Sequence, residues 1–146
     1  MNNAQFVYVS YISAKPENLW NALIDPEITR KYWQHVNASD WKVGSKWEHR
    51  DSDNNNLDLV GKVVEFSPPR KLVLSWAFPA DIANEDKHSR VTLAIEPYRD
   101  ISCLTVTHDS LEAGSEMLEG ITYGWPKVIS SLKSLMEKGK ALPKLW

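Results

Sequence analysis

The second half of the chain contains a regular series of strand-like segments, and this series constrains the fold more than any other feature. Five segments, at about 45–50, 58–66, 71–78, 89–96 and 101–109, are rich in β-branched and aromatic residues. The links between them, such as DSDNNN, SPPR and PYRD, are short and have the composition of turns. Sequential strands joined by such short links pair antiparallel. The series therefore predicts an antiparallel sheet.

Alternation within these segments predicts that one face of the sheet is apolar and aromatic. Every second residue of a strand lies on the same face. By this rule the following residues share the inner face: Trp47, His49, Leu72, Leu74, Trp76, Val91, Leu93, Ile95, Leu104, Val106 and His108. The residues between them are mostly polar, as Lys46 and Glu48 are. We expect this face to be covered by helices and to bury two histidines.

The N-terminal third predicts one strand and two short helices. Residues 5–13 (QFVYVSYIS) have the composition of a strand, and Pro16 fits the first turn of a helix. Asp25 can cap a second helix over 26–33, in which Pro26 takes the first position. The segment HVNASDWKVGSK that follows is interpreted as a loop.

A long amphipathic helix is predicted near the C-terminus, with Ser115 as its N-cap and Gly139 near its end. Apolar residues recur at three- and four-residue steps in LEGITYGWPKVISSLKSLME, residues 118–137. The same stretch contains Gly120, Gly124 and Pro126, and Pro126 cannot donate a helical hydrogen bond. One hypothesis is that GITYGWP shapes the mouth or roof of a pocket. The alternative is that a kink lets the helix follow a curved sheet over a solid core.

The order β-α-α-β-β-β-β-β-α, with helices gathered on one side of the sheet, predicts an α+β fold. A chain of 146 residues fits one domain over 1–146. Seven tryptophans are unusual at this length. They either fill one core or line one cavity, since an indole ring suits both.

Charge and hydropathy argue against two classes of partner. Seventeen basic residues oppose nineteen acidic ones and form no cluster, so nucleic acid is not an expected partner. No apolar run approaches the roughly eighteen residues that cross a bilayer, so we expect no membrane insertion. The N-terminus lacks the basic start of a signal peptide, and the single Cys103 fits a reducing compartment. These features favour a cytoplasmic location.

Motifs of catalysis, cofactor binding and metal binding are absent from the sequence. There is no G-x-S-x-G, Walker A or G-x-G-x-x-G sequence. The four histidines (His35, His49, His88 and His108) do not have zinc-site spacing, and DSDNNNLD lacks the glycine and glutamate of a calcium loop. We therefore expect no metal, no cofactor and no catalytic residue. The inward-facing His49 and His108 either contact a ligand, act as acid or base, or are hydrogen-bonded within the core.

Four segments carry a resemblance to a known family: LWNALIDPEITRKYW, SDWKVGSKW, VTHD and LEGITYGWPKVISSLKSLME. Together they resemble the SRPBCC or START-like helix-grip superfamily, in the branch of the activator of heat shock protein 90 ATPase homologue, C-terminal domain. The resemblance spans residue 6 to about 140. It implies a curved antiparallel sheet wrapped around a long C-terminal helix, with a cavity between them. The residues expected to line that cavity are Trp33, Trp41, Trp47, His49, Trp76, His108, Leu118, Ile121, Thr122, Trp125 and Ile129, with Tyr32, Tyr123 and Glu119 as further candidate polar anchors.

Three functions are considered, and the tryptophan-rich inner face, the proline in the last helix and the lack of a catalytic motif favour the first. The first is a cytoplasmic binding protein for a hydrophobic or aromatic small molecule, such as a lipid-like, polyketide or flavonoid-like ligand. The second, implied by the family name, is an interaction module that regulates a chaperone ATPase in the stress response. The third is a cyclase- or hydratase-type enzyme that uses His49 or His108 with a tyrosine. An exposed apolar patch outside the pocket would favour the second.

Overall fold

The predicted strands form one antiparallel sheet in the computed structural model, which describes residues 2–146. The strands lie side by side in the order β1-β7-β6-β5-β4-β3-β2. The strands are β1 (Ala4–Ile12), β2 (His35–Ser39), β3 (Lys46–Asp51), β4 (Leu57–Ser67), β5 (Lys71–Trp76), β6 (Ser89–Tyr98) and β7 (Ile101–Leu111). Every pairing is antiparallel, as the short links between the strands require.

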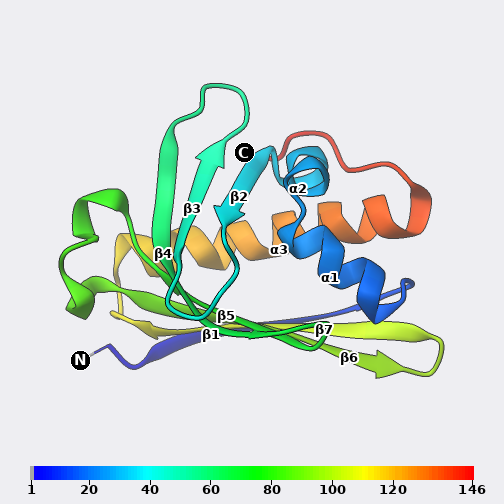
Figure 1. Cartoon of the computed structure of the whole chain (residues 1–146), viewed down its shortest axis with the longest axis horizontal. Helices are drawn as coiled ribbons and strands as arrows, with labels where there is room; N and C mark the ends of the chain where they lie inside the picture. The colour runs from blue at the N-terminus through cyan, green and yellow to red at the C-terminus, as the bar shows by residue number, and fades with distance from the viewer. Residues whose placement is uncertain (1) are drawn as a thin grey trace.

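Three α-helices cover one face of this sheet (Figure 1). They are α1 (Pro16–Ile24), α2 (Pro26–Trp33) and α3 (Glu116–Lys138), and two 3₁₀ turns lie at Pro79–Asp81 and Glu85–Lys87. The expected caps are present: the Asp25 carboxylate accepts from the Glu27 N–H, and the Ser115 hydroxyl accepts from the Leu118 N–H. Gly139 ends α3 at a φ of 74°, where glycine carries no steric penalty. Helix α3 continues through Pro126.

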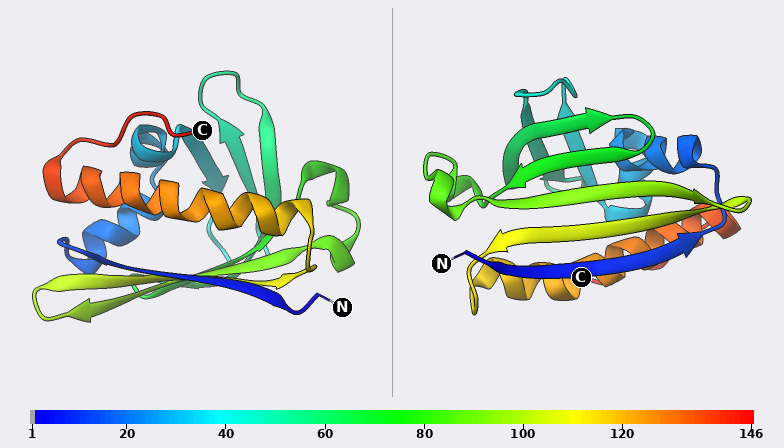
Figure 2. Two further views of the ribbon diagram at one scale, coloured as in Figure 1. Left: turned by 180° about the vertical axis from the view of Figure 1, so that it is seen from behind. Right: turned by 90° about the horizontal axis from the view of Figure 1, so that it is seen from below.

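The sheet curves around α3 because β4 bends. Its register with β5 shifts between Val63 and Glu65, and such a bulge increases local twist. At Gly61 the backbones approach so closely that an added Cβ would lie 1.8 Å from the Ser75 carbonyl oxygen. As a result, β2, β3 and β4 rise beside α3, whereas β1, β5, β6 and β7 run beneath it (Figures 1 and 2). The helix therefore lies in the concave side of the sheet.

The apolar face predicted from alternation is buried, which confirms that reading of the strands. Trp47, His49, Leu74, Trp76 and His108 each expose 3% or less of their surface. Residues of α1, α2 and α3 complete the same core, including Leu19, Leu23, Tyr32, Val128 and Leu132. This core stabilises the fold mainly by removing apolar surface from water.

The loop interpretation of HVNASDWKVGSK was wrong for residues 35–39, which form β2 and pair with β3. The strand is short, lies at the sheet edge and is mostly polar, so alternation gave little signal. Its one buried residue, Asn37, is an amide whose oxygen bonds to His49. A polar side chain that is buried to satisfy a distant partner does not register in hydrophobic periodicity.

The predicted fold class is confirmed: the chain is an α+β protein with a curved antiparallel sheet around a long C-terminal helix, as in the helix-grip fold. In the described part of the chain, no helix is both long and apolar enough to cross a membrane.

Candidate functional site

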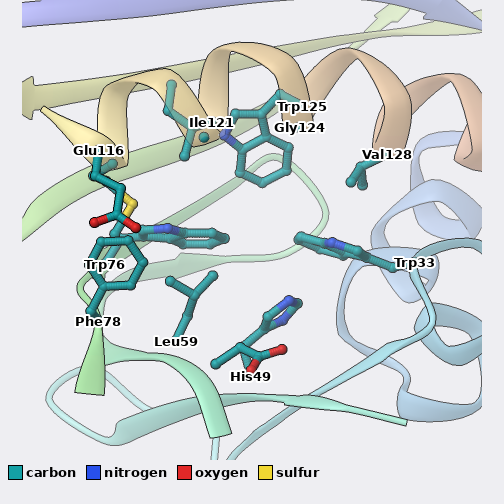
Figure 3. Close-up of a pocket in the computed structure, with 13 residues that line it drawn as sticks. Trp33, His49, Leu59, Trp76, Phe78, Glu116, Ile121, Gly124, Trp125 and Val128 are labelled. Atoms are coloured by element: carbon teal, nitrogen blue, oxygen red, sulfur yellow. The ribbon is translucent and has the colours of Figure 1, made fainter. Parts of the chain in front are cut away.

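A pocket of about 280 Å³ lies between α3 and the sheet, beside Trp125 (Figure 3). The space beside this residue is where GITYGWP was expected to shape a pocket. Its wall is mostly apolar and comes from α2, α3, β3, β4, β5 and the segment after β5. The lining residues are Trp33, His49, Asp58, Leu59, Trp76, Phe78, Glu116, Met117, Gly120, Ile121, Gly124, Trp125 and Val128.

Three tryptophans from three separate elements dominate the wall. Trp33 ends α2, Trp76 ends β5, and Trp125 projects from the middle of α3. The ring centroid of Trp125 lies 5.4 Å from that of Trp33 and 5.5 Å from that of Trp76. In Figure 3, Trp33 and Trp76 lie on opposite sides of the space, with Trp125 above and His49 below. The pocket therefore presents aromatic surface from several directions.

Two glycines of α3 create part of this space. The pocket wall includes Gly120 and Gly124, which lie one helical turn apart. A Cβ added at either position would meet no heavy atom within 4 Å. A larger side chain at either position would therefore extend into open space.

His108 holds Trp125 in place through a chain of hydrogen bonds. The Trp125 Nε1–H donates to His108 Nδ1 at 3.1 Å, so the other ring nitrogen, Nε2, carries the hydrogen of the neutral ring. That Nε2 lies 2.7 Å from the Ser89 hydroxyl, which in turn donates to the Trp76 carbonyl oxygen at 3.1 Å. Burial lowers the pKa of His108 to about 4, and nearby Asp109 offsets part of this effect. His108 is thus a neutral, fully hydrogen-bonded core residue behind the pocket wall.

His49 places an imidazole ring on the pocket wall. Its Nδ1–H donates to the Asn37 side-chain oxygen at 2.6 Å, since an amide oxygen can only accept. Its ring stacks on that of His35, with centroids 4.3 Å apart. Burial, and then repulsion from His35, hold the pKa of His49 well below its usual value. The neutral ring therefore keeps an acceptor lone pair on Nε2.

A cluster of His35, Asp51 and Asp58 lies behind His49, and its potential ligand atoms are within 4.8 Å of one another. His35 contacts the Trp33 carbonyl oxygen through Nδ1 at 2.9 Å and the Asp58 carboxylate through Nε2 at 3.0 Å. These contacts account for the position of the His35 ring against His49. Metal-site spacing could not indicate this cluster, because its members come from three different strands.

The residues predicted for the cavity fall into three groups. Five line the pocket: Trp33, His49, Trp76, Ile121 and Trp125. Trp41, Trp47 and Ile129 instead border a void of about 10 Å³, which is a packed seam of the core. His108, Leu118 and Thr122 are outside the pocket lining, and the Thr122 hydroxyl bonds back to the Leu118 carbonyl oxygen. Trp47 and Trp76 leave their indole N–H groups buried without a partner within residues 2–146.

Apart from Gly120 and Gly124, which belong to the GITYGWP hypothesis, six lining residues were not predicted, and only those of α3 had a signal in the sequence. Glu116, Gly120, Gly124 and Val128 follow one another at four-residue steps, so they share one face of α3. Met117, Ile121 and Trp125 form the adjacent row. Hydrophobic periodicity does not mark this face, because glycine and glutamate do not count toward an apolar stripe. Asp58, Leu59 and Phe78 had no comparable signal.

The search among curated proteins finds no match for this chain. Solved structures share its fold. The Aha1 dimer from Colwellia psychrerythraea is 20% identical over 94% of this chain and 99% of that one, with a TM-score of 0.79. Protein MLL2253 from Mesorhizobium loti is 24% identical over 92% and 98%, with a TM-score of 0.78. DynU16, a protein in the dynemicin biosynthetic locus, is 16% identical over 94% of this chain and 48% of its own, with a TM-score of 0.73.

The family assignment rests on the sequence. The family model described as "Activator of Hsp90 ATPase homolog 1-like protein" matches residues 13–137, which include the Trp33 and Trp125 walls of the pocket. The match extends from the end of β1 almost to the end of α3. The chain therefore belongs to the Activator of Hsp90 ATPase homolog 1-like family.

Proposed function

We propose that this chain is a cytoplasmic binding protein for a hydrophobic, ring-containing small molecule, held in the pocket between the sheet and α3. The observation that carries the proposal is a space of about 280 Å³ with Trp33, Trp76 and Trp125 on its wall. Binding sites for small molecules are mostly apolar clefts with few polar groups, and this pocket has that composition.

The size of the pocket favours a compact ligand. An apolar cavity of about 150 Å³ accommodates benzene, so about 280 Å³ suits a molecule of one or two fused rings. A larger polyketide or flavonoid would place only part of its ring system inside. The same fold occurs in DynU16, a protein in the dynemicin biosynthetic locus, which is in keeping with a small-molecule role.

The lining supports binding without covalent chemistry. It contains no serine, threonine, cysteine or lysine that could act as a nucleophile. His49 has a pKa well below its usual value, which makes it a weak general base at neutral pH. His108 has both ring nitrogens engaged within the protein. A binding role therefore has more support than the cyclase or hydratase alternative.

The test is a ligand screen by tryptophan fluorescence with a parallel thermal shift, using flat aromatics, flavonoids, polyketides, fatty acids and sterols. A hit should quench fluorescence and raise the melting temperature with concentration, because only binding to the folded state stabilises it. Gly124→Leu should weaken the hit by filling the pocket. Glu119→Leu, on an exposed position of α3 outside the lining, is the matched control. Absence of any hit, or a hit insensitive to Gly124→Leu, would reject the proposal.

A second candidate is an interaction module that regulates a chaperone ATPase, as the family name suggests. The observation in its favour is a row of apolar side chains on the outer face of edge strand β1. Val7, Val9 and Tyr11 are each about half exposed. Stimulation of Hsp90 ATPase by the chain, lost in Val7→Ser/Val9→Ser, would support this candidate. No stimulation by the unaltered chain would reject it.

A further inference from the structure

The pocket wall contains more acidic than basic side chains. They are His49, Asp58 and Glu116, and no lysine or arginine lines the pocket. Asp58 is paired with His35 at 3.0 Å. Glu116 has no ion-pair partner in the part of the chain that the structure describes. The pocket therefore carries uncompensated negative charge at its Glu116 end, where Figure 3 places the carboxylate near Trp76 and Phe78.

A second hollow, of about 300 Å³, adjoins the pocket at this end and is also acidic. The pocket and this outer groove share Phe78, Glu116 and Met117. The charged residues that line the groove are Asp81, Asp86, Lys87, Glu112 and Glu116. Four carboxylates against one ammonium give the groove beside the pocket a net negative charge, which attracts cations and repels anions.

The aromatic wall also favours a positively charged ligand. The face of an indole ring has a negative electrostatic potential, and tryptophan is the best partner for an organic cation within about 6 Å of its centroid. Trp33, Trp76 and Trp125 supply three such rings around one space. His49 adds no positive charge, because its ring is neutral and its free Nε2 accepts hydrogen bonds. The unpaired Glu116 carboxylate, the tryptophan faces and the His49 Nε2 thus favour a ligand that is cationic or donates hydrogen bonds.

We propose that the pocket selects organic cations, with a small aromatic or apolar body between the tryptophans and a quaternary or protonated amine at the Glu116 end. This inference rests on the proposed binding function and narrows its ligand class. Carboxylate-bearing ligands such as fatty acids meet repulsion from Glu116 and from the acidic groove.

The test compares three probes of similar shape: phenyltrimethylammonium, its neutral isostere tert-butylbenzene, and the anion benzenesulfonate. Dissociation constants are measured by tryptophan fluorescence at low and moderate salt, with a parallel thermal shift. We expect phenyltrimethylammonium to bind at least about tenfold more tightly than tert-butylbenzene, the benefit of one well-placed cation–aromatic contact. Benzenesulfonate should bind most weakly.

Two variants locate the charge effect. Glu116→Gln should weaken phenyltrimethylammonium several-fold and leave tert-butylbenzene unchanged. Glu119→Gln is the matched control, since it removes a carboxylate from the same first turn of α3 but outside both hollows. Its affinities should match those of the unaltered chain.

The outcomes separate this inference from the proposed function. A preference for the cation below about threefold, or an equal response to Glu116→Gln and Glu119→Gln, would overturn cation selection. If tert-butylbenzene still bound in that case, the hydrophobic pocket would stand. Failure of all three probes to bind would overturn both.

Discussion

Replacing Gly120 or Gly124 by alanine should make the protein more stable, although both glycines lie in its longest helix. Glycine inside a helix is about 1 kcal/mol less favourable than alanine, because its backbone loses more freedom on folding. A Cβ at either position would meet no heavy atom within 4 Å, so no clash offsets this gain. Each variant should therefore gain about 1 kcal/mol, and the double variant about 2 kcal/mol if the sites act independently.

The assay is urea unfolding followed by far-ultraviolet circular dichroism, which avoids the tryptophan signals of the pocket. In a parallel thermal melt, a gain of about 2 kcal/mol in a chain of this length corresponds to a rise in melting temperature of roughly 4–8 °C. Gly61→Ala is the opposing control, because its Cβ would lie 1.8 Å from the Ser75 carbonyl oxygen and must displace backbone. That variant should lose several kcal/mol or fail to fold, as overpacked sites do (about 1–3 kcal/mol or more).

Stability lost at Gly120→Ala or Gly124→Ala would refute the reasoning, since it would mean that neighbouring atoms occupy the space. A stability gain accompanied by weaker ligand binding would indicate that the glycines are kept for the pocket at a cost in stability.

Three further predictions concern the buried histidines. His108→Phe should lose about 2–4 kcal/mol in urea unfolding, because the Trp125 N–H loses its acceptor and Ser89 loses a partner; a loss below about 1 kcal/mol would contradict the hydrogen-bond chain. The contribution of buried, neutral His108 to the free energy of unfolding should be fully present above pH 6.5. It should be lost progressively as the pH falls toward 4. The reason is that His108 in the unfolded chain binds a proton in this window, whereas folded His108, with a pKa of about 4, does not. The expected loss of unfolding free energy is on the order of 3 kcal/mol at pH 4. A flat stability profile from pH 7 to 5 would refute this prediction. Asn37→Leu should remove the acceptor that holds the proton of His49 on Nδ1, so that the ring also populates the Nε2–H tautomer, and nitrogen chemical shifts can detect this change. A proton on Nε2 in the unaltered chain would contradict the hydrogen bond from Nδ1–H to Asn37.

The fold was largely predictable because its signals are local. Burial of every second residue depends only on neighbouring positions in a strand, and His49 and His108 followed this rule into the core. The caps at Asp25 and Ser115 are likewise encoded within three residues. Strand β2 was missed because its buried Asn37 has meaning only opposite His49, twelve positions away.

The pocket was less predictable because part of its wall is formed by glycines, which have no side chain. A hydrophobic stripe marks positions that fill space, so Leu118 and Ile129 were expected in the lining although they lie outside it. Gly120 and Gly124 were expected only as part of GITYGWP, at the mouth or roof of a pocket. Asp58 and Phe78 enter the site only through the bend of the sheet at β4, which no short sequence window contains.

The two inward histidines look alike in the sequence and have opposite roles in the site. His108 accepts the Trp125 N–H and so fixes the indole ring on the pocket wall, which Gly120 and Gly124 also line. A wall held by a buried hydrogen bond resists collapse, since rotation of Trp125 would leave both partners unsatisfied. His49 is held from the other side, by Asn37 and the His35 ring, and keeps one lone pair free. One histidine thus holds part of the pocket wall in place, and the other offers the pocket a hydrogen-bond acceptor.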